Sequence, residues 1–145
     1  MGGVTQAAID LVKRWEGFRA KPYLCPAGVP TIGYGTVIKS LDHPPVTEAE
    51  ATELLIAELE RCISASLKMC PVLDTSPNKL AAVASFTYNL GAGRLKASTL
   101  RAKINEQSWE EAGVEFRKWV WAGGRKLPGL VARREDEARL FLETR

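Results

Sequence analysis

The sequence predicts a mostly helical α+β protein with one small sheet near its N-terminal end. Over most of the chain, apolar residues recur at the three- and four-residue spacing of amphipathic helices. Residues 21–39 differ, because glycines and prolines there alternate with Tyr, Val and Ile, as in short strands joined by tight turns. A length of 145 residues is typical of one domain. We therefore expect residues 1–145 to form a single unit, with a hairpin lobe at about residues 20–46.

The first expected helix begins after Thr5, whose side chain can cap it, and ends at Gly17. Its apolar positions follow the helical period: Ala8, Ile9, Val12 and Trp15. Glu16 then falls in the last turn of this helix. The strand pattern of residues 21–39 follows, and it is the only strand-like region that we expect.

A second helix begins at Thr47, which forms a capping box with Glu50, and Pro71 closes it. Its apolar stripe consists of Ala51, Leu54, Leu55 and Leu59. A third helix begins at Ser76-Pro77 and contains no charged residue from position 80 to the glycines at 91 and 93, where we expect it to end. This helix is the expected core of the fold.

In the remaining third of the chain, the sequence pattern predicts shorter helices. The first is expected to run from Ser98 or Thr99 through Ile104. The second is capped by Ser108 with Glu111 and is expected to run through Trp119. The last is an amphipathic helix from Pro128 to about Leu142. No internal repeat or low-complexity linker separates these segments. The sum is a mostly helical domain.

Composition excludes several classes of protein. Hydrophobic residues make up 46% of the chain and charged residues 26%, which are ordinary values for a globular domain and not for a disordered one. The longest uncharged stretch is too short to cross a bilayer, and the N-terminal residues lack a signal-peptide pattern. We therefore expect synthesis in the cytosol, no stable membrane insertion and three reduced cysteines.

The net charge of +3 is distributed unevenly. Residues 1–116 hold 12 Lys and Arg against 13 Asp and Glu, whereas residues 117–145 hold 8 against 4. A basic C-terminal face suits an anionic partner such as a cell-wall polymer, nucleic acid or lipid headgroups. A basic helix that is solvated and binds nothing fits the same charge distribution, so charge alone does not distinguish these two interpretations.

The sequence lacks the residues and motifs that several kinds of catalysis require. His43 is the one histidine, and no two cysteines have the Cys-x-x-Cys spacing of a zinc site. A Gly-x-Ser-x-Gly elbow and a phosphate-binding loop are also missing. We therefore expect a protein that uses neither a metal ion nor a cofactor.

Three polar residues stand in or beside the expected hairpin: Glu16, Cys25 and Thr31, with eight and then five residues between them. Together with the following Ile32-Gly33-Tyr34-Gly35-Thr36, this spacing resembles the catalytic stretch of the tailed-phage lysozymes, the endolysins that cleave bacterial peptidoglycan. The resemblance continues in order along the chain through Ser85-Phe86-Thr87-Tyr88-Asn89-Leu90-Gly91, Ser98-Thr99-Leu100, Trp119, Gly123-Gly124-Arg125, Leu127-Pro128-Gly129-Leu130, Arg133-Arg134 and Leu140-Phe141.

The resemblance implies a lysozyme-like fold, in which a groove separates a small N-terminal hairpin lobe from a larger helical lobe. It also implies hydrolysis of the β-1,4 bond between N-acetylmuramic acid and N-acetylglucosamine, with Glu16 as the general acid. A group that donates a proton near neutrality must be shielded from bulk water. We therefore expect the Glu16 side chain to lie in a crevice.

Cys25 stands where many similar lysozymes carry Asp. A thiol titrates near pH 8.5 and an Asp near 3.9, so three roles stay open for Cys25: a thiolate favoured by nearby cations, a neutral thiol that orients water, and a covalent nucleophile. We favour the orientation or activation of water. The resemblance gives Thr31 the task of holding that water. The trio favours single displacement with inversion, which needs an acid and a base roughly 6.5 to 9.5 Å apart.

Tyr34, Trp121 and Arg133 are further candidates for contact with substrate. The resemblance suggests that Arg133 or Arg134, of which we favour Arg133, approaches Glu16 across the lobes, where its charge would favour the carboxylate over the acid. An exposed basic face shared with Lys126 and Arg139 is the alternative for these arginines. Trp119 and Trp121 can stack on sugar rings, although tryptophans at the end of a helix more often belong to the core. We expect Cys62 and Cys70 to be structural.

Two rival functions stay open. A lytic transglycosylase would break the same bond with a single Glu and no water, leaving anhydro ends. A basic nucleic-acid-binding domain would show affinity for DNA that falls steeply with salt. For the endolysin we expect a monomer that binds peptidoglycan and no nucleic acid, is made in the host cytoplasm, and acts in the periplasm after release through a pore such as a holin.

Overall fold

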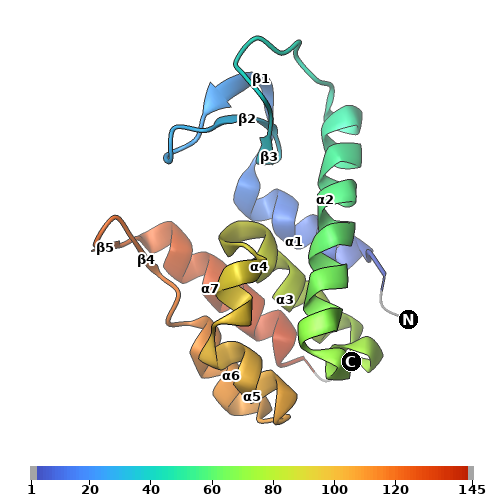
Figure 1. Ribbon diagram of the computed structural model, residues 1–145, viewed down its shortest axis with the longest axis vertical. Coiled ribbons are helices and arrows are strands. Elements are labelled where there is room, and N and C mark those ends of the chain that lie inside the picture. Colours follow the sequence, from blue (N-terminus) through green and yellow to red (C-terminus); the bar gives the residue numbers. More distant parts are fainter. Residues whose placement is uncertain (1–2, 144–145) are drawn as a thin grey trace.

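A computed structural model describes residues 3–143, and helices make up most of it (Figure 1). The α-helices and strands follow in the order α1 (Gln6–Glu16), β1 (Arg19–Leu24), β2 (Pro30–Gly33), β3 (Thr36–Val37), α2 (Glu48–Met69), α3 (Pro77–Leu90), α4 (Ala92–Lys96), α5 (Thr99–Asn105), α6 (Trp109–Phe116), β4 (Trp121–Ala122), β5 (Arg125–Lys126) and α7 (Pro128–Phe141). The expected mostly helical α+β class is confirmed.

The strands β1, β2 and β3 form one antiparallel sheet in sequence order. Tyr23 pairs with Thr31 across β1 and β2, and Thr31 pairs with Val37 across β2 and β3. The sheet stands at one end of the molecule, and α2, 22 residues long, runs from beside the sheet down to the other helices (Figure 1). The sheet and the helical body thus form the two lobes that the sequence led us to expect.

The ends of the first two helices agree with the local sequence. The Thr5 side chain accepts a hydrogen bond from the Ala8 N–H, and Gly17 ends α1 with a positive φ of 71°. Thr47 and Glu50 form the complete capping box at the start of α2. Because Gly17 turns the chain directly into β1, the last residue of α1 lies where the two lobes meet.

The core of the helical lobe is centred on α3. All eight residues from Leu80 to Thr87 are buried, and α2, α7 and α1 pack against this helix. Burial on every side explains why the segment carries no charge. In the residues that the structure describes, no helix is long and apolar enough to cross a membrane.

The structure corrects five details of the expected elements. A second hairpin, β4–β5, exists, and its two-residue strands are too short to show a strand period. The chain continues past Gly91 into α4, so Gly93 is helical, and Pro71–Thr75 forms a short 3-10 helix. The helix α6 ends at Phe116 and not at Trp119, and the Ser108 side chain makes no capping hydrogen bond.

Candidate functional site

Glu16 is the last residue of α1, and its side chain is only 18% exposed. Its Oε2 accepts a hydrogen bond from Nη1 of Arg133 on α7 at 2.8 Å. The carboxylate therefore sits between the lobes, shielded from bulk water and held in place by one guanidinium. This is the arrangement that the sequence suggested for these two residues.

Gly35, in the turn between β2 and β3, lies directly against this carboxylate. Its φ is +80°, and a Cβ built on it would lie 2.5 Å from Oε1 of Glu16. Only a residue without a side chain gives the carboxylate this room while holding this backbone conformation. The Gly-Tyr-Gly segment therefore shapes the pocket around the acid.

Two hollows adjoin the contact between Glu16 and Gly35. The first, of about 340 Å³, has Glu16 in its wall together with Trp15, Asn89, Leu127, Gly129, Leu130 and Arg133. The second, of about 360 Å³, is lined by Gly35, Thr36, Val37, Glu58, Arg61 and Tyr88. A chain-like ligand that fills both hollows would pass beside the Glu16 carboxylate.

Cys25 and Thr31 lie together on the β1–β2 hairpin. The Val29 carbonyl accepts hydrogen bonds both from the Cys25 N–H at 3.0 Å and from the Thr31 hydroxyl at 2.8 Å. Backbone hydrogen bonds from Val29 and Ala27 lower the pKa of the Cys25 thiol below its ordinary value. The hairpin thus favours the thiolate, which is the form that can accept a proton from water.

The Tyr23 phenol links this pair to the acid. Its pKa is raised by burial, then by the negative charge of Glu16 and, to a lesser extent, by that of Cys25. Glu16 and Cys25 therefore both lie close enough to Tyr23 for their charges to act on its phenol.

Arg133 belongs to a buried ionic cluster that sequence reasoning missed. Its Nε donates to Oε2 of Glu137 at 3.2 Å, and its Nη2 lies 3.3 Å from both Oγ and the carbonyl oxygen of Ser85. Arg134, which is fully buried, contacts the same carboxylate and donates to the Asn89 side chain. The three- and four-residue spacings from Glu137 back to the two arginines are the signal that could have found the cluster.

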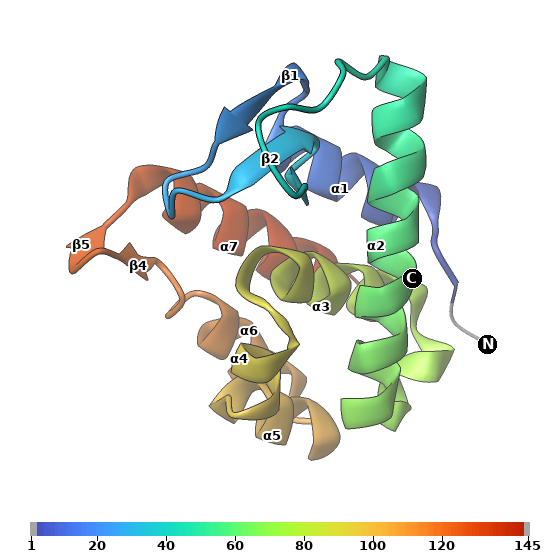
Figure 2. The same cartoon turned by 45° about the horizontal axis from the view of Figure 1, so that its top comes forward.

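Not all predicted site residues reach the cleft. Tyr34 is 6% exposed, and its hydroxyl donates to Glu48, so its side chain belongs to the interior of the hairpin lobe and does not line either hollow. Trp119 packs edge-on against Phe86 and belongs to the core. Trp121 is instead 64% exposed on β4. The β4–β5 hairpin and the β1–β2 turn project from the same side of the molecule in both views (Figures 1 and 2).

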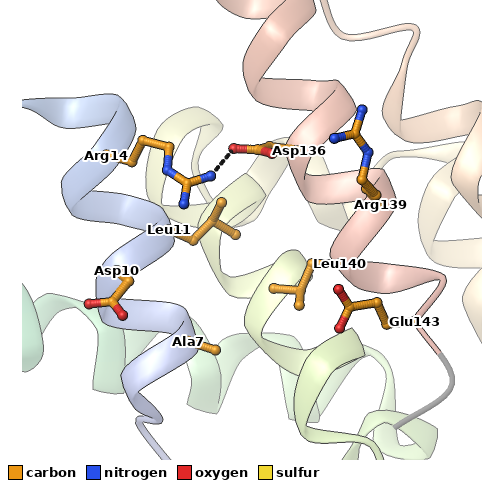
Figure 3. Close-up of a pocket in the computed structure, with 8 residues that line it drawn as sticks. All are labelled: Ala7, Asp10, Leu11, Arg14, Asp136, Arg139, Leu140 and Glu143. Carbon is orange, nitrogen blue, oxygen red and sulfur yellow. Dashed lines mark hydrogen bonds and ion pairs between the residues drawn. The ribbon is translucent and has the colours of Figure 1, made fainter.

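A third hollow lies between α1 and α7 and shares no residue with the two beside Glu16 (Figure 3). Arg14 crosses it to bind Asp136 at 2.7 Å, and the same carboxylate accepts a hydrogen bond from the Trp15 indole. Leu11 and Leu140 lie in its apolar part. These contacts fasten α1 to α7 and so support the position of Glu16, one residue further along.

The described residues contain no group of three or more His, Cys, Asp and Glu side chains placed to hold a metal ion. Cys25, Cys62 and Cys70 are all free. What the site offers is a shielded carboxyl next to two hollows, with a thiol and a hydroxyl on the facing hairpin. Such a set can protonate a leaving oxygen and orient water.

Comparison with known proteins identifies the family of the chain. Residues 13–137 match the family model described as phage lysozyme. The chain is 38% identical over 146 residues to the endolysin of Bacillus phage B103, and the match covers 96% of the chain and 54% of that endolysin. It therefore spans about half the length of that relative.

Two further similarities extend over nearly the full length of both partners. The chain is 34% identical over 142 residues to the endolysin of Acyrthosiphon pisum secondary endosymbiont phage 1, covering 95% of the chain and 97% of the relative. Among solved structures, the muramidase domain of SpmX from Asticaccaulis excentricus superposes with a TM-score of 0.89 at 27% identity, covering 99% of each chain.

Proposed function

The chain belongs to the phage lysozyme family, and from that premise we propose that it is an endolysin that hydrolyses the β-1,4 bond between N-acetylmuramic acid and N-acetylglucosamine in peptidoglycan. The observation that carries the proposal is the Glu16 carboxyl, 18% exposed and next to two hollows. A glycan strand laid through both hollows would present a glycosidic oxygen to this carboxyl.

In this proposal Glu16 is the general acid. It donates its proton to the glycosidic oxygen as the bond to the anomeric carbon breaks, so that the departing sugar leaves as a neutral alcohol. Arg133 holds the side chain through one oxygen, Oε2, while Oε1 lies against Gly35. Binding of a sugar beside Glu16 would weaken the contact with Arg133 and favour the protonated acid.

Cys25 and Thr31 are the proposed water-binding pair. The Thr31 hydroxyl is fixed by its hydrogen bond to the Val29 carbonyl, and its oxygen keeps lone pairs that can accept a hydrogen bond from water. The hydrogen bonds that lower the pKa of the Cys25 thiol make its thiolate available to take up a proton from that water as it attacks the anomeric carbon. The water would attack from the face opposite the departing sugar, so the product would carry the inverted configuration.

We assign Trp121 and Arg133 to substrate contact, each for a different reason. Trp121 offers an exposed ring on the side of the molecule where the two hairpins project, and such a ring can stack on a sugar. Arg133 forms part of the wall of the hollow beside Glu16. We expect peptidoglycan to be the partner of this protein, and the protein to be a monomeric enzyme that needs no metal ion or cofactor.

We propose further that the protein is made in the host cytoplasm and acts on peptidoglycan in the periplasm after release, with a holin as the releasing pore. Expression in cells with and without a co-expressed pore, followed by culture turbidity, would test this. Rapid lysis only in cells that carry the pore is expected, whereas equally rapid lysis without it would contradict the requirement.

The enzymatic proposal is tested by mass spectrometry of purified sacculi digested with wild-type protein and with Glu16→Gln. Wild type should release muropeptides that end in reducing N-acetylmuramic acid, and Glu16→Gln should release almost none. Anhydro ends would identify a lytic transglycosylase, and intact glycan strands with the wild type would refute the enzyme altogether. Proton NMR of the first product formed reports whether its anomeric configuration is inverted.

A further inference from the structure

Glu137 is the most deeply buried carboxylate close to the site, and its side chain has no exposed surface. Oε2 accepts hydrogen bonds from the Ser85 hydroxyl at 2.6 Å, from Nε of Arg133 at 3.2 Å and from Nη2 of Arg134 at 3.3 Å. Oε1 lies 2.8 Å from Nε of Arg134. Glu137 does not line the hollows beside Glu16, and Arg133 is the residue that contacts both carboxylates.

The balance of charges in the cluster indicates what the Glu137 carboxylate does. The cluster contains two guanidinium groups, Arg133 and Arg134, and two carboxylates, Glu16 and Glu137. A charge in a buried site acts strongly on its neighbours because little water screens it. If Glu137 were neutral, both positive charges would be offset by Glu16 alone, and the Glu16 anion would be favoured over the acid.

We propose that Glu137 is a positioning residue for catalysis: it fixes the Arg133 guanidinium and offsets its charge, so that Arg133 can hold Glu16 while Glu16 serves as the proton donor. The inference rests on the proposed function, in which Glu16 is the general acid. Glu137 itself touches neither the substrate nor the reacting atoms.

The surroundings of the cluster add few other charges. The pKa of Glu137 is raised, chiefly by burial, while the guanidinium groups of Arg134 and Arg133 and the hydrogen bond from Ser85 act in the opposite direction and favour the carboxylate. The helix α3 contributes the neutral hydroxyl of Ser85, and α1 contributes Glu16.

Two phenols also face Glu16, namely Tyr88 on α3 and Tyr23 on β1. The pKa of each is raised, chiefly by burial and then by the negative charge of Glu16. Both phenols are therefore neutral over the pH range in which a lysozyme is active. The two arginines are thus the cations that Glu137 has to balance.

The direction of the pH effect follows from the role of the acid. A general acid is active while protonated, so activity falls on the alkaline side as Glu16 loses its proton. Glu137→Gln leaves the cluster with an additional uncompensated positive charge, which favours the Glu16 anion. The alkaline limb of the kcat/KM profile should therefore move to lower pH, by about one unit.

The test compares Glu137→Gln with wild type on purified, soluble glycan strands between about pH 4 and 9, a range that spans the titration of a general acid. Glu135→Gln is the matched control, because it makes the same change two residues earlier on α7, at a half-exposed carboxylate paired with Arg117. We expect a shifted alkaline limb for Glu137→Gln and a profile superimposable on wild type for Glu135→Gln. A folded Glu137→Gln enzyme whose profile superimposes on that of wild type, with only a lower stability, would overturn the proposal.

Because removal of a buried charge can unfold a protein, Ser85→Ala provides a milder version of the same test. It deletes the hydroxyl that stabilises the Glu137 carboxylate, so it should shift the limb in the same direction by a smaller amount. If Glu137→Gln does not fold, an unshifted Ser85→Ala profile would overturn the proposal.

Carbon-13 NMR titration of the Glu16 carboxyl separates this inference from the proposed function. If wild type fails to cleave glycan, the proposed function falls, yet the titration still shows whether Glu137→Gln or Ser85→Ala lowers the pH at which Glu16 loses its proton. An unchanged Glu16 titration in the folded variants would refute the inference even if the wild type is a lysozyme.

Discussion

The Glu16 carboxylate is bound by the Arg133 guanidinium at 2.8 Å, although the two residues lie 117 positions apart in the chain. The ion pair joins the end of α1 to the middle of α7 and so fixes the acid between the lobes. It also favours the anion, whereas a general acid must be protonated. The site therefore holds its acid firmly in place while resisting its protonation, and this balance underlies the predictions below.

Glu16→Gln should lower the rate of glycan cleavage by about two to four orders of magnitude, because an amide of the same shape has no proton to donate to the leaving oxygen. The decrease in turbidity of stripped cell walls measures this rate. Glu53→Gln, at an exposed position on α2, is the control and should retain wild-type activity. Comparable activity in the two variants would remove Glu16 from the mechanism.

Cys25 should be the one thiol that reacts in the native protein. The pKa of its thiol is lowered, whereas burial raises the pKa of Cys62 to about 12 and that of Cys70 to about 11. Intact-mass measurement should therefore find a single iodoacetamide adduct, and activity should fall in step with its formation.

Substitutions at Cys25 test whether the thiol itself matters. Cys25→Asp supplies another group that can accept a proton and should stay active, whereas Cys25→Ala should lose about a hundredfold in kcat. Cys62→Ala is the control for the loss of a thiol elsewhere, and its effect should be on stability. If Cys25→Ala works as well as wild type, the residue only fills its place in the hairpin.

Gly35→Ala should lower activity more than it lowers stability. The new methyl group would lie 2.5 Å from Oε1 of Glu16, so the carboxylate would have to leave its position. Gly91→Ala is the matched control, because Gly91 also has a positive φ, of +94°, but a methyl group there would have nothing within 4 Å. Each substitution should cost about 1 to 2 kcal/mol of stability from backbone strain.

The ratio of activity to folded protein is therefore the informative quantity for these two glycines. It should fall at least tenfold for Gly35→Ala and stay near the wild-type value for Gly91→Ala. Equal ratios would mean that the close approach of Gly35 has no catalytic consequence.

Local sequence predicted those parts of the fold that local residues determine. The cap at Thr5, the capping box at Thr47 and Glu50, and the end of α1 at Gly17 all depend on residues within four positions of one another. The β4–β5 hairpin escaped prediction because two residues in a strand are too few to show alternation. Its turn, Gly123-Gly124, was visible in the sequence but equally compatible with a loop.

For the candidate site, the sequence named residues but could not give their geometry. The spacing of Glu16, Cys25 and Thr31 singled them out, but their arrangement between the lobes depends on tertiary contacts. Tyr34 shows the limit of the pattern, because it follows the motif in sequence while its hydroxyl turns inward to Glu48. Glu137 was missed because its three- and four-residue spacing from Arg134 and Arg133 is shared by exposed pairs such as that of Glu135 with Arg139, so the spacing alone does not show burial.

Glu48 should make the protein less stable in acid. Hydrogen bonds from Tyr34, Lys13 and Thr52 lower the pKa of this carboxyl from 4.5 to about 2. A carboxyl whose pKa is lower in the folded state contributes stability above its unfolded pKa, and this contribution is lost as the pH falls toward 2.

Urea unfolding midpoints between neutral pH and about pH 2 measure this contribution. Glu48→Gln should be less stable than wild type at neutral pH, and the difference should shrink as the pH falls from about 4.5 to about 2. A constant difference over that range would mean that the ionisation of Glu48 does not stabilise the fold.

Trp121→Ala should weaken the binding of glycan while leaving the fold intact. Because the ring is 64% exposed, its removal leaves no cavity, and the unfolding midpoint should change little. If the ring stacks on a sugar, KM for glycan strands should rise several-fold while kcat changes less, since stacking is present in both the bound state and the transition state. Val114→Ala removes an apolar side chain of similar exposure, 52%, from α6 and should leave KM unchanged. Quenching of tryptophan fluorescence by glycan oligomers in wild type, absent in Trp121→Ala, would locate the contact; an equal KM in both proteins would show that this ring lies outside the path of the substrate.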